Sequence, residues 1–245
     1  MRRTVPQGLH GRFRRAIILN VPTHVTEFSP AIEDYAKAIF ALQSSLDGPV
    51  STTAIAERLG VTPASASGMV RKLAELELVE HERYKGVELT AQGRRVALEV
   101  LRHHRLLECY LAQSLGVPWD RVHDEAEVLE HVLSEDLEAL IAAKLGHPTR
   151  DPHGDPIPSA DLELEERPSR SLASLEAGDR GVLVRVSDSE PEMLRYLAEL
   201  GIAPGDGFEV VERQPFDGPL FVRFGGDVHV LGGALADAMR VEVAA

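Results

Sequence analysis

Four side chains that can bind a metal ion lie within one stretch of the sequence, WDRVHDEAEVLEH. They are His123, Glu127, Glu130 and His131. If this stretch is an α-helix, successive residues are 100° apart and all four side chains fall on one face. Imidazole and carboxylate groups without a thiolate suit a divalent first-row metal ion of intermediate hardness. The sequence therefore predicts a metal site on this helix.

A helix pair is needed to position these groups. The preceding segment HHRLLE places His104 and Glu108 one helical turn apart, where they can face the first set across the pair. Asp120 is the expected N-cap of the second helix. The apolar residues that would pack this helix against the core are Val122, Ala126, Leu129, Val132 and Leu133.

A zinc protease is the alternative chemistry for this stretch. The segment EVLEH resembles the inverted protease signature His-x-x-Glu-His, but Glu127 stands where that signature has its first His. A metallohydrolase is therefore the weaker hypothesis.

Composition places the chain among ordinary globular proteins. It has 245 residues, of which 44% are hydrophobic and 27% charged, which suits several small domains. The single cysteine, Cys109, excludes an intrachain disulfide and is typical of a cytoplasmic protein. No apolar stretch approaches the ~20 residues of a membrane span, so no membrane partner is expected. Residues 1–27 are Arg-rich and are expected to be a flexible extension.

A helix-turn-helix pattern follows a first helix at 31–46. Ser51 or Thr52 caps one short helix, and Thr62 and Pro63 open the next. Two short strands at 78–79 and 87–89 flank the segment HERYKG, which predicts a winged helix.

The second helix of this motif carries a small, polar face, as close approach to a DNA groove requires. With the wing, the expected DNA-binding residues are Thr62, Ser65, Ser67, Gly68, Arg71, Lys72, Arg83 and Lys85. The net charge of −13 argues against coating nucleic acid non-specifically, so any DNA contact must be local. A metal-independent winged helix that binds protein is the alternative.

The rest of the chain divides into a helical part, a linker and a β part. A helix is expected from 91 to 115, and Ser134 caps a further helix whose apolar residues exceed the needs of a monomer, which predicts a homodimer. The linker, 148–170, is rich in Pro, Asp and Glu. Short apolar runs separated by Gly, Pro and Asp then predict a small β-barrel, with one helical insertion, PEMLRYLAEL.

Together these motifs resemble the diphtheria toxin repressor family of metal-dependent transcription regulators. The resemblance covers roughly residues 29–245 and is carried by IEDYAKAIFAL, AERLGVTPASASGMVRKL, HHRLLE, VHDEAEVLEHVLSEDLE, DPHGDPIP and LRYLAELGIAPGD. It implies a mainly α fold with a small β domain: a winged helix at 28–90, a helical metal-binding and dimerisation domain at 91–147 and an SH3-like β-barrel at 171–245. It also implies a repressor of metal-uptake genes that binds a palindromic operator.

The resemblance assigns two sets of metal ligands. The primary site takes Asp34 from the first helix with Glu127, Glu130 and His131. The second site takes His104, Glu108 and His123, completed by Glu190 or, as a rival, Glu192.

These identities also suggest the metal. Iron sensors of the family have Met and Cys at the positions of Asp34 and Glu127, whereas its manganese sensors have carboxylates there, as this chain does. Because Mn²⁺ prefers oxygen-rich ligand sets, we expect Mn²⁺, with Fe²⁺ as the alternative. Lys37 departs from the pattern, since some manganese sensors have a carboxylate at that position.

Overall fold

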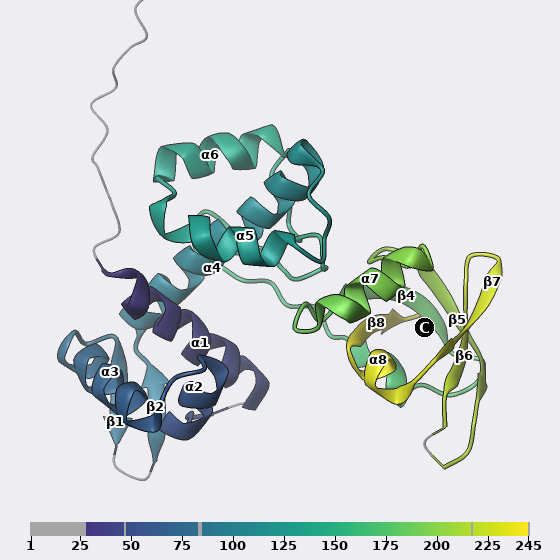
Figure 1. Cartoon of the computed structure of the whole chain (residues 1–245), viewed down its shortest axis with the longest axis horizontal. Coiled ribbons are helices and arrows are strands. Elements are labelled where there is room, and N and C mark those ends of the chain that lie inside the picture. The colour runs from purple at the N-terminus through teal and green to yellow at the C-terminus, as the bar shows by residue number, and fades with distance from the viewer. Residues whose placement is uncertain (1–27, 47, 83–84, 217, 245) are drawn as a thin grey trace, which may run out of the picture.

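An N-terminal winged helix forms the first domain of the computed structural model, which describes residues 28–244 except 47, 83–84 and 217. The expected extension at 1–27 and Arg83 therefore lie outside the described residues. The domain comprises α1 (Pro30–Leu46), α2 (Thr52–Arg58), α3 (Pro63–Glu75) and the antiparallel pair β1 (Val79–Glu82) and β2 (Gly86–Leu89) (Figure 1). Ser51 and Thr62 are the N-caps, each accepting a backbone N–H from the first helical turn. The predicted winged helix is confirmed.

The second domain is helical and is joined to the first by one long helix. It comprises α4 (Ala91–Leu115), α5 (Val122–Leu129), the 3₁₀ turn η1 (Glu130–Val132) and α6 (Glu135–Lys144). Helix α1 packs against α4, so the DNA-binding domain and the helical domain meet along α4 (Figure 1). Ser134 caps α6 as predicted.

Two local expectations in this domain were wrong. The helix after Trp119 begins one residue later than expected, and its N-cap is Arg121, without a side-chain hydrogen bond. The Asp120 carboxylate instead accepts from Arg195 at 3.2 Å. The α-helix also ends at Leu129 and not beyond His131, because η1 tightens the chain there.

The segment after α6 is packed, in contrast to the extended linker predicted for 148–170. Asp151, His153 and Ile157 are buried, and Ile157 joins the core of the helical domain. Arg102 and Arg105 on α4 donate to the backbone carbonyls of Pro158 and Pro156. Residues 150–158 are therefore an ordered part of the structure beside α4.

The third domain is built on one antiparallel sheet. Its elements are β3 (Arg170–Ser171), η2 (Leu172–Ser174), β4 (Arg180–Val186), α7 (Pro191–Glu199), β5 (Gly207–Arg213), β6 (Leu220–Phe224), β7 (Asp227–Leu231), α8 (Gly233–Asp237) and β8 (Met239–Val243). The strand order is β3-β8-β4-β5-β6-β7, with register shifts in β4 and β5. The sheet curves around a core that includes Leu183, Leu194 and Val222 (Figure 1). This is the small β domain that was predicted, and α7 is the predicted helical insertion.

Among the described residues, no helix combines the length and the apolar composition needed to cross a bilayer.

Candidate metal centres and DNA-binding face

The primary site joins the DNA-binding domain to the helical domain. Asp34 on α1 meets Glu130 and His131 of η1, and their ligand atoms lie within 4.8 Å of one another. His131 Nε2 is 2.9 Å from Asp34 Oδ1 and 3.5 Å from Glu130 Oε1. Burial raises the pKa of Asp34, partly offset by His131 and Lys37. Three of the four predicted ligands therefore come together.

Glu33 orients His131 and was missed by sequence reasoning. Its carboxylate, 2% exposed, accepts from His131 Nδ1 at 2.6 Å. In the neutral ring this bond keeps the proton on Nδ1 and leaves Nε2 free as a ligand, an arrangement common around metal-bound histidines. Glu33 shares its helix face with the buried Ala36 and Phe40, which is the signal that could have identified it.

Lys37 lies between Glu127, the fourth ligand expected for the primary site, and the other ligands. Its ammonium lies 2.6 Å from Glu127 Oε1 and 2.5 Å from Glu130 Oε1. Burial lowers the pKa of Lys37, but the carboxylates of Glu130 and Glu127 outweigh burial and raise it. Glu127 is thus grouped with His104 and Glu130 around the ammonium, and not with Asp34.

The second site brings together all three residues predicted for it on the helix pair. His104 Nε2 lies 3.1 Å from Glu108 Oε1 and 3.2 Å from His123 Nδ1. Burial lowers the pKa of His104, but Glu108 and Glu130 raise it to about 9. Hydrogen bonds from Asp188 and Glu108 raise the pKa of His123 to about 10. In the absence of metal, these imidazoles hold protons where a metal ion would bind.

The C-terminal domain contributes Asp188 to this site. Asp188 Oδ2 is 3.2 Å from His123 Nδ1. Burial raises the pKa of Asp188, but His123 outweighs burial and lowers it. Glu190, the residue expected here, occupies the N-cap position of α7, and among the described residues neither Glu190 nor its rival Glu192 forms an ion pair with His123, whereas Asp188 does. The residue in contact with His123 is two positions earlier in the sequence than the one expected, because the loop after β4 passes His123 before α7 begins.

Asp151 and His153, from the segment expected to be a linker, extend the second site. Together with Glu108 they form a fully buried cluster. His153 Nε2 donates to the Trp119 carbonyl at 2.7 Å. Its Nδ1 has no hydrogen-bond partner and lies 3.7 Å from Glu108 Oε1. A metal ion bound between Nδ1 and this carboxylate oxygen would give both atoms a partner. The donor set fits a divalent metal ion.

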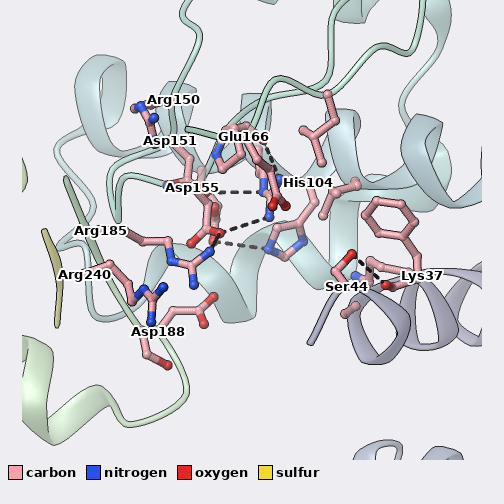
Figure 2. A pocket seen from close by; sticks show the side chains of 18 of the residues that line it. Lys37, Ser44, His104, Arg150, Asp151, Asp155, Glu166, Arg185, Asp188 and Arg240 are labelled. Atoms are coloured by element: carbon pink, nitrogen blue, oxygen red, sulfur yellow. Dashed lines mark hydrogen bonds and ion pairs between the residues drawn. The ribbon is translucent and has the colours of Figure 1, made fainter. Parts of the chain in front are cut away.

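A cavity of about 750 Å³ borders this second site (Figure 2). It is lined by His104, Glu108, His123 and Asp188 of the second site and by four arginines, Arg105, Arg150, Arg185 and Arg240. Asp155 accepts from Arg105 and Arg185, each at 3.2 Å, so the segment at 150–158 is tied to both α4 and β4. The second site is consequently assembled from the helical domain, this segment and the C-terminal domain.

The predicted DNA-binding face lies along α3 and the wing. Thr62, Ser65, Gly68, Arg71, Lys72 and Lys85 are exposed and Ser67 is half-buried. Thr62 Oγ1 caps α3 and contacts Ser65 Oγ at 2.9 Å, while Arg71 Nε donates to the Ser67 carbonyl. A Cβ on Gly68 would meet no atom within 4 Å, so this helix face is unobstructed.

Three family descriptions match consecutive parts of the chain. Residues 27–87 match "Iron dependent repressor, N-terminal DNA binding domain", residues 90–159 match "Iron dependent repressor, metal binding and dimerisation domain", and residues 170–243 match "FeoA domain". The diphtheria toxin repressor of Corynebacterium jeikeium is 31% identical over 233 residues, covering 86% of this chain and 95% of that protein. The chain belongs to the diphtheria toxin repressor family.

Other relatives support this assignment. The iron-dependent repressor IdeR of Mycobacterium leprae is 32% identical, over 86% of this chain and 96% of that protein. A solved structure of a manganese-dependent transcriptional repressor in complex with manganese is 46% identical, covers 87% of this chain and 100% of that one, and superposes with a TM-score of 0.81. The manganese regulator SloR is 31% identical over 89% of this chain and 100% of that one, with a TM-score of 0.71.

Membership of the family fixes the class of function. The chain is a metal-dependent, DNA-binding and dimerising transcriptional repressor, and not an enzyme. The metallohydrolase and the metal-independent adaptor considered from the sequence are thereby excluded.

Proposed function

We propose that this protein is a Mn²⁺-activated homodimeric repressor of metal-uptake genes that binds a palindromic operator. The observation that carries the proposal is the position of Asp34. This ligand belongs to α1 of the DNA-binding domain, whereas Glu130 and His131 belong to the helical domain. A bound divalent ion would be shared by Asp34 and the Glu130–His131 turn and would add its positive charge between their carboxylates. Asp34, Glu130 and His131 would then fix α1, and with it α3, relative to α4.

The donor set favours Mn²⁺ over Fe²⁺. Asp34 and Glu130 offer carboxylate oxygens and His131 one imidazole, and this cluster of described residues contains no sulfur ligand. Oxygen-rich sets suit Mn²⁺, which lies low in the affinity series for nitrogen and sulfur ligands. The 46% identical solved structure is of a manganese-dependent repressor. Fe²⁺ remains the alternative, because curated relatives such as IdeR are iron-dependent.

Dimerisation and operator symmetry follow from the outer face of the helical domain. Val128, Val132, Leu137 and Leu140 expose 72%, 77%, 49% and 67% of their surface. Exposed apolar side chains grouped on adjacent elements indicate an interface. A two-fold dimer built here would present two copies of α3, and such a dimer matches a palindromic operator.

The primary site is tested with His131→Ala, which removes one ligand while leaving the helical core intact. We expect Mn²⁺-dependent binding to the operator to weaken roughly tenfold or more, as loss of metal-site groups usually does. Fluorescence anisotropy with labelled operator and increasing Mn²⁺ measures it. His229→Ala, in β7, is the control and should behave as the wild type.

The metal is tested in the same assay with Mn²⁺, Fe²⁺, Co²⁺ and Zn²⁺ under anaerobic conditions. Activation of the wild type at lower Mn²⁺ than Fe²⁺ supports the manganese proposal. An equal or stronger response to Fe²⁺ would assign the protein to iron regulation instead. Unchanged operator binding in His131→Ala would remove the primary site.

A further inference from the structure

We propose a third divalent-metal site, formed by Glu99, His103 and Glu135. One ligand atom from each residue lies within 4.8 Å of the others. Glu99 and His103 are one turn apart on α4, and Glu135 is the first residue of α6. None of the three belongs to the primary or the second site, so this inference goes beyond the proposed function.

His103 is the residue that indicates a ligand. Its side chain is 1% exposed, and its Nδ1 lies 3.2 Å from the Glu130 carbonyl. A carbonyl oxygen only accepts hydrogen bonds, so Nδ1 carries the proton in the neutral ring. The buried Nε2 has no hydrogen-bond partner. Nε2 lies 3.2 Å from Glu138 Oε2 and 3.9 Å from Glu135 Oε1, so a metal ion bound here would take the place of a proton between these groups.

Among the described residues, neither Glu99 nor Glu135 forms an ion pair with a lysine or an arginine. Glu138 is already paired, since Arg102 Nε donates to it at 2.8 Å. Carboxylate oxygens of Glu99 and Glu135 lie within 4.8 Å of each other, and burial, followed by the proximity of Glu135, raises the pKa of Glu99. Two carboxylates in contact repel when both are ionised, and a divalent ion removes that repulsion.

The site has a route to solvent and an open coordination sphere. The Glu135 side chain is 56% exposed, whereas His103 is buried, so an ion can enter at Glu135 and keep water on its outer side. Two carboxylates and one imidazole suit first-row divalent ions such as Mn²⁺, Co²⁺ or Zn²⁺. An ion here would also hold the His103 ring, which supports the backbone of Glu130, a primary ligand. The third site would therefore steady the primary one.

The experiment compares wild type with Glu135→Gln, and uses Asp136→Asn as the matched control. Asp136 is the next residue on α6, is exposed and belongs to no ligand cluster among the described residues. Equilibrium dialysis against Mn²⁺ gives the ions bound per chain, and anomalous scattering from Mn²⁺-soaked crystals locates them. We expect a peak between Glu99, His103 and Glu135 in the wild type. Glu135→Gln should bind one ion fewer per chain, and Asp136→Asn should match the wild type.

The full-length protein is used throughout, and Glu99→Gln gives a second variant if Glu135→Gln folds poorly. Operator binding with Mn²⁺ should persist in both variants because the primary ligands are intact. Absence of Mn²⁺-dependent operator binding in the wild type would contradict the proposed function, whereas the ion counts and the anomalous peak test the third site. Wild-type crystals without a peak at these residues, or equal ion counts in wild type and both variants, would overturn the proposal. His103 would then be an imidazolium paired with Glu138.

Discussion

At the scale of single residues, we expect Lys37 to limit how many metal ions the primary region binds. Its ammonium contacts Glu127 and Glu130, two carboxylates that also lie beside His104. A lysine buried among carboxylates acts as a fixed positive charge of the protein itself. It ties α1 to α5 and η1 without metal, and it occupies the position that a second ion bridging Glu127 and Glu130 would take. We therefore expect one metal ion in the primary region.

Replacing Lys37 with a carboxylate should convert this region into a two-ion site. In Lys37→Glu, the new carboxylate joins Glu127 and Glu130 beside His104, and the three carboxylates repel one another until a divalent ion binds among them. The expected result is one additional Mn²⁺ per chain compared with wild type, measured by isothermal titration calorimetry.

The charge change itself is controlled with Lys144→Glu, at the exposed end of α6. This variant should bind Mn²⁺ with the wild-type stoichiometry. If Lys37→Glu also retained that stoichiometry, Lys37 would not stand in for a metal ion.

Ligands on regular helices were predictable from the sequence, and ligands on loops were not. His104, Glu108 and His123 were identified because helical spacing fixes which side chains share a face. Asp188 and His153 lie on irregular segments, and their approach to Glu108 depends on how the segment at 150–158 and β4 pack. That packing has no local sequence signal, so Glu190 was predicted where Asp188 lies.

At the scale of secondary-structure elements, we expect α3 to be the part of the winged helix that meets DNA. Its buried face, including Ala66, Val70 and Leu73, packs into the N-terminal core. The opposite side leaves Arg71 and Lys72 exposed on a chain of net charge −13. Positive charge on this face is therefore local, and each phosphate contact should affect the salt dependence of operator binding separately.

Removing either cation should weaken DNA binding without affecting the metal sites. For Arg71→Ala and Lys72→Ala, the slope of log affinity against log salt should decrease by about one for each lost phosphate contact. Anisotropy titrations at several salt concentrations measure the slope, with Arg223→Ala in β6 as the control. An unaltered slope in both variants would show that neither side chain contacts phosphate, and altered Mn²⁺ affinity without DNA would point to a structural defect.

The existence of the elements was easier to predict than their ends. The apolar spacing of α1, α4 and α7 and the caps at Ser51, Thr62 and Ser134 appear in the structure as expected. The change from α-helix to η1 at Glu130 was not predicted. It arises because Asp34, Lys37 and His104 all contact the Glu130–His131 turn, so tertiary contacts prevail over helical periodicity.

At the scale of the whole molecule, the metal-free protein keeps protons on the histidines of its second metal site. The pKa of His104 is raised from 6.5 to about 9, because Glu108 and Glu130 outweigh the effect of burial. In the unfolded chain the ring has its ordinary pKa near 6.5. Folding is therefore favoured by the charged imidazole, and this contribution is fully present below pH 6.5 and is lost as pH rises toward 9. His123 and His103 also have raised pKa values and contribute with the same sign.

Stability in the presence of a chelator should consequently decrease between pH 6.5 and 9. The free energy of unfolding, from urea titrations in EDTA, should fall on the order of 2 kcal/mol across this window through His104. The carboxylates of Glu108 and Glu130 do not contribute there, because their pKa values are lowered and they are ionised throughout. His104→Gln should flatten the decrease.

With saturating Mn²⁺ the wild type should lose this decrease, because a ligating imidazole must be deprotonated and binding becomes stronger as pH rises. A metal-free wild type whose stability is constant or increases from pH 6.5 to 9 would contradict the charged state of His104 and, with it, the competition between protons and metal at the second site.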